Sequence, residues 1–252
     1  PSSQAALRLL PIDGIRPADW WPFSQDLSND RRINAVVDWM RRPADIRPKI
    51  ITLYFDTVDM AGHYYGPAPS EKLHAAIAEV EIGRLQQQLD HLGQPANFVI
   101  VSDHGMTETS PERIIHLDQI MPRDQYHLVE EGNYAGIEPL EGNADAVRAA
   151  FLQPHEHMQC WTRENIPAEF AYGTNPRVPS ILCLPEIGWV VYQDAPEWMT
   201  GIGGGHGYDQ RDPDMRAFFL ASGPGITAGG PLPIFDNVNV YSLVARLAGI
   251  TP

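Results

Sequence analysis

The order of an apolar run, a helical stripe and a second apolar run constrains the fold most strongly. Residues 50–55 and residues 97–102 are each short and apolar enough to form a buried strand. Between them Ser70 can cap a helix whose apolar residues recur at helical spacing, and Gly93 can end it. This order predicts a βαβ unit with a right-handed crossover, and therefore an α/β fold built on a parallel sheet.

Ligand-type side chains directly follow both apolar runs. Asp59 and His63 come after the first run, in a stretch that Gly66 marks as a turn, and Asp103 and His104 follow the second run. Because ligands bind at the carboxyl ends of parallel strands, we expect the two Asp/His pairs to share one edge of the sheet. Carboxylate oxygen and imidazole nitrogen suit a divalent cation such as zinc. Taken alone, Asp59 and His63 fit a solvated turn better than a metal site, because many surface loops contain such a pair.

A third candidate histidine lies in a glycine-rich stretch. Residues 201–207 read Gly-Ile-Gly-Gly-Gly-His-Gly, which places His206 among residues that let the backbone approach another group closely. The alternative is a flexible loop in which this histidine is incidental. Residues 107–187 are less regular and rich in proline, and we expect an inserted subregion or cap there, without a core of its own.

Charge and hydropathy exclude some classes of function. The net charge of −14 argues against a protein that coats a nucleic-acid polymer, which would need a basic face. It leaves room for a small anionic substrate, since bound cations can reverse the local field. No apolar run approaches the roughly 18 residues that a membrane helix needs. The chain starts at Pro1 without an initiator Met, so we expect a processed chain or a fragment.

Three motifs in chain order resemble a known family. They are Asp59-x3-His63, then Ser-Asp-His-Gly-Met at residues 102–106, then His-Gly-Tyr-Asp at residues 206–209. With residues 52–55 before them, they resemble the nucleotide pyrophosphatase/phosphodiesterase (NPP) family of the alkaline phosphatase superfamily. Weaker matches continue through residues 215–219 and 235–238, so the resemblance covers most of the chain. It implies an alkaline-phosphatase-like, mostly parallel sheet flanked by helices.

The resemblance also implies a two-zinc site. Asp59, His63 and His206 would hold one zinc ion, while Asp103 and His104 would contribute to the second. In the family the second ion also takes an early Asp and a Thr or Ser nucleophile, both from segments upstream of those seen here. We therefore expect residues 1–252 to be the C-terminal part of the catalytic domain and inactive alone, with the missing N-terminal segment as a structural partner.

The activity implied for the complete domain is zinc-dependent hydrolysis of nucleotide phosphodiester or pyrophosphate bonds through a covalent phospho-enzyme. By the same resemblance, Tyr54 matches an aromatic near the substrate site and Phe23 aligns with a base-stacking position, although Phe23 could equally be a hydrophobic anchor. Two alternatives stay open. One is another hydrolase of the superfamily, resembling phosphonoacetate hydrolase or a phosphomonoesterase. The other is a non-catalytic metal-binding remnant.

Two cysteines bear on the cellular compartment. Cys160 and Cys183 could be two buried thiols or one disulfide. We expect the disulfide, which is consistent with an extracytoplasmic enzyme, either periplasmic or secreted. Any targeting segment would lie upstream.

Overall fold

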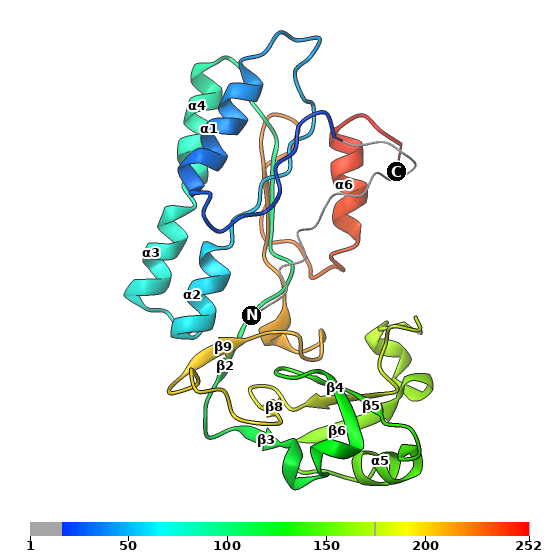
Figure 1. The fold of residues 1–252 in the computed structure, drawn as a ribbon. Helices are drawn as coiled ribbons and strands as arrows, with labels where there is room; N and C mark the ends of the chain where they lie inside the picture. Colours follow the sequence, from blue (N-terminus) through cyan, green and yellow to red (C-terminus); the bar gives the residue numbers. More distant parts are fainter. Residues whose placement is uncertain (1–16, 174, 252) are drawn as a thin grey trace. The chain divides into compact units, whose positions relative to one another are not determined.

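Residues 17–173 and 175–251 are described by a computed structural model (Figure 1). The chain divides into two compact units. Unit 1 holds Pro1–Thr57 and Ile77–Ala96, and unit 2 holds Val58–Ala76 and Asn97–Pro252. In the described part of the chain, no helix has both the length and the apolar character needed to cross a membrane.

Unit 1 is organised around a pair of helices that lie side by side in Figure 1, α1 (Asn29–Met40) and α4 (Ile82–His91). Apolar residues at helical spacing are buried on both helices: Ile33, Val36 and Val37 on α1, and Leu85 and Leu89 on α4. The cap of α1 is Ser28, whose hydroxyl accepts from the backbone N–H of Arg31. The helix therefore begins directly after Ser28, at Asn29.

The predicted helix after Ser70 is two helices in the structure. Its start is as predicted, because the Ser70 hydroxyl accepts from the backbone N–H of Leu73 at 3.2 Å and α3 (Glu71–Glu79) follows. Glu81 then has a φ of 47°, in the left-handed region that a right-handed helix cannot include, so the chain breaks there before α4. Gly93 closes α4 with a φ of 65°.

The predicted strand at residues 50–55 was wrong as far as the described residues go, because within them this segment pairs with no other strand. Strand β1 (Phe98–Val101), which was expected as its parallel neighbour, pairs antiparallel with β10 (Phe219–Ser222). Apolar composition predicts that a segment is buried and extended, but it does not specify which segment will supply the ladder hydrogen bonds.

The other strands belong to unit 2, as β1 and β10 do. β2 (Thr107–Thr109) pairs antiparallel with β9 (Gly203–Gly205), and β3 (Ile114–His116) pairs parallel with β8 (Val190–Tyr192). A four-stranded antiparallel sheet has the order β4 (Tyr126–Glu130), β5 (Ala135–Pro139), β7 (Ile181–Pro185), β6 (Met158–Thr162). The helices of this unit include α5 (Ala144–Phe151) and α6 (Asn239–Leu247). The 3-10 turns are Leu117–Gln119, Arg123–Gln125, Arg163–Asn165, Ala168–Phe170 and Pro213–Met215.

The segment at residues 107–187 contributes most of a hydrophobic cluster within unit 2, and its assignment as an inserted cap stays a prediction. Eleven buried residues form this cluster: Leu117, Tyr126, Ala135, Ile137, Val147, Phe151, Met158, Cys160, Ile181, Cys183 and Val191. Its strands are only three to five residues long, too short for a clear alternation of apolar and polar residues. The predicted Cys160–Cys183 disulfide is confirmed and joins residues directly opposite each other on β6 and β7.

Candidate metal centre

Asp59 and His63 lie on a helix, α2 (Thr57–Tyr65), and not in the predicted turn. The glycine signals had been assigned to a turn, but Gly62 lies inside the helix and only Gly66, with a φ of 75°, marks its end. Residues four apart on a helix share one face, so α2 presents the carboxylate and the imidazole together. The Nε2 atom of His63 lies 3.5 Å from Oδ2 of Asp59.

His206 completes a cluster of three. It follows β9, and its Nε2 atom lies 3.6 Å from Oδ1 of Asp59. One ligand atom from each of Asp59, His63 and His206 lies within 4.8 Å of the other two. Among the described residues, this is the one group of three or more His, Cys, Asp or Glu side chains with that spacing. One carboxylate and two imidazoles form a donor set that suits zinc.

The hydrogen bonding within the cluster fits a bound cation. Oδ1 of Asp59 is buried and has no hydrogen-bond partner among the described residues. A buried, unsatisfied carboxylate oxygen is costly unless a cation or donor faces it. Nδ1 of His63 lies 2.8 Å from the carbonyl oxygen of Gly204, which assigns the ring proton to Nδ1 and leaves Nε2 free as a ligand atom.

The environment of His206 favours the neutral imidazole. Burial lowers the pKa of His206 below its ordinary value, and the neighbouring His104 and His63 lower it further, while Asp59 and Asp103 oppose the shift. A metal ion binds the unprotonated ring, so a lowered pKa keeps this residue competent as a ligand at mildly acidic pH.

Asp103 and His104 lie next to this cluster. The ring of His104 stacks on that of His206, with centroids 3.5 Å apart and an interplanar angle of 11°. Nε2 of His104 lies 3.4 Å from Oδ1 of Asp103, and Nδ1 lies 2.9 Å from the carbonyl oxygen of Gly105. The structure therefore brings all five predicted ligand residues into one neighbourhood, although Asp103 and His104 gain no third ligand of their own from the described residues.

The glycine-rich stretch is a strand packed against α2, rather than a flexible loop. A methyl group on Gly203 would lie 2.8 Å from the carbonyl oxygen of His63. A methyl group on Gly204 would overlap the carbonyl oxygen of Gly62 and lie 2.8 Å from the sulfur of Met106. Glycine is required at both positions for β9 to approach the helix that carries two of the ligands. This backbone contact was not predicted from the sequence, because its partners lie about 140 residues apart.

The two predicted base-binding aromatics meet in unit 1. The rings of Phe23 and Tyr54 are 5.5 Å apart in an edge-to-face arrangement. The guanidinium of Arg32 lies 5.6 Å from the centroid of the Phe23 ring and donates to the backbone carbonyl of Tyr54 at 3.1 Å. Phe23 is 47% exposed and Tyr54 is 53% exposed, so each keeps accessible surface.

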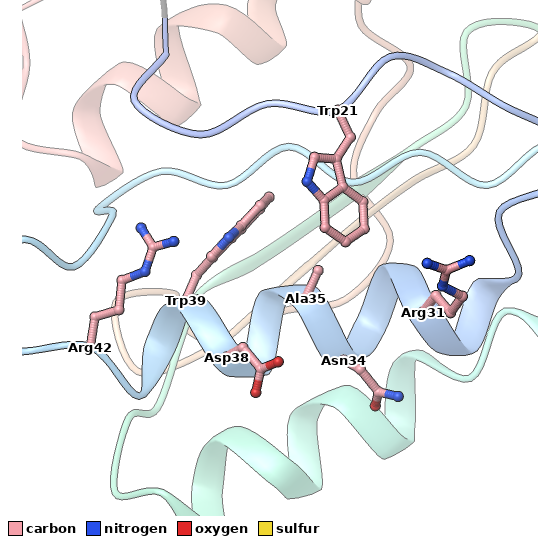
Figure 2. A pocket seen from close by; sticks show the side chains of 7 residues that line it. All are labelled: Trp21, Arg31, Asn34, Ala35, Asp38, Trp39 and Arg42. Carbon is pink, nitrogen blue, oxygen red and sulfur yellow. The ribbon is translucent and has the colours of Figure 1, made fainter.

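A separate hollow of about 310 Å³ lies over α1 in unit 1 (Figure 2). Its lining contains none of the predicted site residues: Trp21, Arg31, Asn34, Ala35, Asp38, Trp39 and Arg42. Trp21 and Trp39 meet edge to face at 6.1 Å. Arg42 pairs with Asp19 through two hydrogen bonds, and Asp38 pairs with Arg41, so neighbours already neutralise much of the charge around the hollow.

Comparison with protein families identifies related sequences. Residues 3–209 match the family described as Type I phosphodiesterase / nucleotide pyrophosphatase. Ectonucleotide pyrophosphatase/phosphodiesterase family member 5 of Homo sapiens is 30% identical over 239 residues, covering 93% of this chain and 49% of that protein. Bis(5'-adenosyl)-triphosphatase enpp4 of Xenopus laevis is 30% identical over 244 residues, covering 95% and 53%. The chain thus spans about half the length of these curated relatives.

The solved structures that this chain resembles are also ectonucleotide pyrophosphatase/phosphodiesterases. Human ectonucleotide pyrophosphatase/phosphodiesterase 5 superimposes with a TM-score of 0.85 at 29% identity, over 93% of this chain and 63% of that one. The murine protein, as an inactive threonine-to-alanine variant in complex with AMP, gives 0.83 at 28% identity, over 92% and 62%. The predicted alkaline-phosphatase-like α/β fold is confirmed by these neighbours.

Proposed function

Because this chain belongs to the type I phosphodiesterase/nucleotide pyrophosphatase family, we propose that it is the C-terminal part of a zinc-dependent catalytic domain. The complete domain would hydrolyse phosphodiester or pyrophosphate bonds of nucleotides. The nucleotide class is supported by the relatives, one of which is named as a bis(5'-adenosyl)-triphosphatase and another of which was solved with AMP.

The observation that carries the proposal is the buried Oδ1 of Asp59, which has no hydrogen-bond partner among the described residues and lies 3.6 Å from Nε2 of His206, while Oδ2 lies 3.5 Å from Nε2 of His63. We assign Asp59, His63 and His206 as the ligands of one zinc ion. Asp103 and His104 would contribute two ligands to a second ion. Its remaining ligands, together with a Thr or Ser nucleophile, would come from an upstream segment. Two facts support a contribution from outside this chain: the chain spans about half the length of its relatives, and a threonine-to-alanine variant of one relative is inactive.

The reaction proposed for the complete domain is attack of that Thr or Ser on phosphorus, followed by hydrolysis of the covalent phospho-enzyme. When bound, zinc supplies Lewis acidity and offsets the negative charge that develops on the phosphoryl oxygens. Backbone groups of this chain hold the rings of the proposed histidine ligands in place. The carbonyl oxygens of Gly204 and Gly105 fix the rings of His63 and His104 by accepting from Nδ1. Phe23 and Tyr54 are proposed to stack on the nucleobase, worth about 1–3 kcal/mol per base.

Exposed apolar side chains on or beside the antiparallel pair of β1 and β10, called here the β1–β10 ribbon, support the proposal that another segment of the domain packs against it. Val101 at the end of β1 is 43% exposed, Leu220 on β10 is 43% exposed, and Phe218 just before β10 is 57% exposed. β10 is the one ladder neighbour that β1 has among the described residues. We propose that the upstream segment of the domain covers this ribbon. We also propose an extracytoplasmic location, supported by the Cys160–Cys183 disulfide.

The test compares this chain with a longer form that includes the upstream segment. Hydrolysis of bis-p-nitrophenyl phosphate and of the p-nitrophenyl monoester is measured for both forms in the presence of zinc. We expect negligible turnover from residues 1–252, and preferential hydrolysis of the diester by the longer form. Robust turnover from the 252 residues would refute the incomplete-site proposal. Preference of the longer form for the monoester would refute the phosphodiesterase assignment.

A further inference from the structure

A short turn lies directly against the segment that carries Asp103 and His104. Its sequence, Asp-Pro-Asp-Met at residues 212–215, favours a tight 3-10 turn over Pro213–Met215. Asp212 caps the turn, because its side chain accepts from the backbone N–H of Asp214 at 2.9 Å, and Pro213 occupies the first position with its φ already fixed. The local sequence thus sets the shape of this turn.

The turn makes two hydrogen bonds with the ligand segment. The backbone N–H of Gly105 donates to the carbonyl oxygen of Met215 at 3.1 Å. The hydroxyl of Thr107, which is only 5% exposed, donates to Oδ2 of Asp214 at 2.8 Å. The fit is close, because a methyl group on Gly105 would overlap the carbonyl oxygen of Asp214. Gly105 is therefore held both by packing and by its own N–H.

Gly105 in turn orients His104. Its carbonyl oxygen lies 2.9 Å from Nδ1 of His104, so the peptide groups of Gly105 connect the turn to the imidazole ring. The other end of the segment is also held. Ser102 donates from its backbone N–H to the carbonyl of Phe218 at 3.0 Å, and its hydroxyl accepts from the N–H of Phe218 at 2.7 Å. The segment between Ser102 and Thr107 is thus supported on both sides of His104.

We propose that Asp214 is a positioning residue that sets the ring orientation of His104 through Thr107 and Gly105. Its side chain accepts from Thr107, and in this proposal it acts by holding the backbone that carries His104. That the ring orientation of His104 matters for metal binding rests on the proposed function above. The orientation of the ring does not depend on that function.

The test uses the metal-free, 15N-labelled full chain, with histidine side-chain spectra reporting the tautomer of each ring. A His104→Gln variant assigns the His104 signals. In the wild type we expect the Nδ1–H tautomer to dominate at His104. One hydrogen bond is worth about fivefold in an equilibrium constant, so Asp214→Ala and Thr107→Val should each raise the minor tautomer of His104, by up to that factor. Asp214→Asn keeps an acceptor oxygen for Thr107 and should restore the wild-type signals.

The control is Asp90→Ala, which removes an exposed carboxylate from the last turn of α4 and should leave the His104 signals unchanged. Thr107→Val preserves side-chain shape and so keeps the test available if Asp214→Ala fails to fold. Unchanged His104 signals in Thr107→Val would overturn the proposal, as would an Asp214→Asn variant that behaves like Asp214→Ala. Failure of the chain to bind zinc, with the tautomer shifts as expected, would instead count against the proposed function alone.

Discussion

Among the described residues, Asp59 carries the one buried carboxylate oxygen that lacks a hydrogen-bond partner. Its neighbours are imidazoles: His63 is one helical turn away on α2, and His206 arrives from β9. The helix spacing and the glycine-rich approach of β9 together produce this arrangement. Residue types that look unremarkable one at a time become a candidate cation site because two elements deliver them to one place.

The pKa of His206 makes stability depend on pH in the metal-free protein. Burial lowers this pKa in the folded state, so the unfolded chain takes up a proton more readily. The stabilising contribution is present above the ordinary pKa of about 6.5 and is lost as the pH falls through the folded value. Denaturant unfolding between pH 7.5 and 5 in chelator should show stability falling with pH.

A His206→Gln variant should flatten that slope, while His74→Gln, which removes an exposed histidine from α3, should not. An equal slope in the wild type and in His206→Gln would contradict the assignment of the pH dependence to this residue.

Gly204 should tolerate no side chain. Gly204→Ala would push β9 away from Gly62 and Met106, and we expect a loss of about 1–3 kcal/mol in the free energy of unfolding, as for other overpacked sites. The matched control is Gly201→Ala in the same stretch, where an added methyl group meets nothing within 4 Å. Chemical denaturation of the wild type and both variants measures the free energy of unfolding. Equal stability of the two variants would show that the close approach of β9 is not needed.

At the scale of elements, the four-stranded sheet of unit 2 is stabilised in two ways, by a buried apolar cluster and by the cross-strand Cys160–Cys183 disulfide. The bond closes a loop with a sequence separation of 23, for which chain entropy predicts stabilisation of about 3 kcal/mol. The double variant Cys160→Ala/Cys183→Ala should lose about that much in denaturant unfolding. Thiol titration of the folded, unreduced wild type should find no free thiol, and finding two would contradict the disulfide.

Some features of the helices and strands were predicted correctly from the sequence and others were not. The caps at Ser70 and Gly93 were predicted correctly, because each depends on local chemistry. The helix around Asp59 was predicted as a turn, because the sequence does not distinguish a glycine that packs inside a helix from one that ends it. The ladder predicted for residues 50–55 failed because strand pairing depends on distant segments.

At the scale of the whole molecule, the types and order of the candidate ligands were readable from the sequence, but the groups that orient them were not. The grouping of Asp59, His63 and His206 around one ion was predicted from the resemblance to the NPP family. The carbonyl of Gly204, which fixes His63, belongs to a residue 141 positions away, and such a backbone contact leaves no signature in composition or spacing. Asp214 had a local signal, the Asp-Pro-Asp-Met turn, yet its partner Thr107 could only be found in the fold.

The most direct test of the central proposal is a zinc-competition titration of residues 1–252 against a chromophoric chelator. The wild type should bind one zinc ion tightly. Removing a ligand with His206→Ala should weaken that affinity by more than about 100-fold, beyond the usual effect of residues that only support ligands. His157→Ala removes a histidine outside the cluster and should leave the affinity unchanged. Equal zinc affinity in the wild type and in His206→Ala would contradict the assignment of this centre.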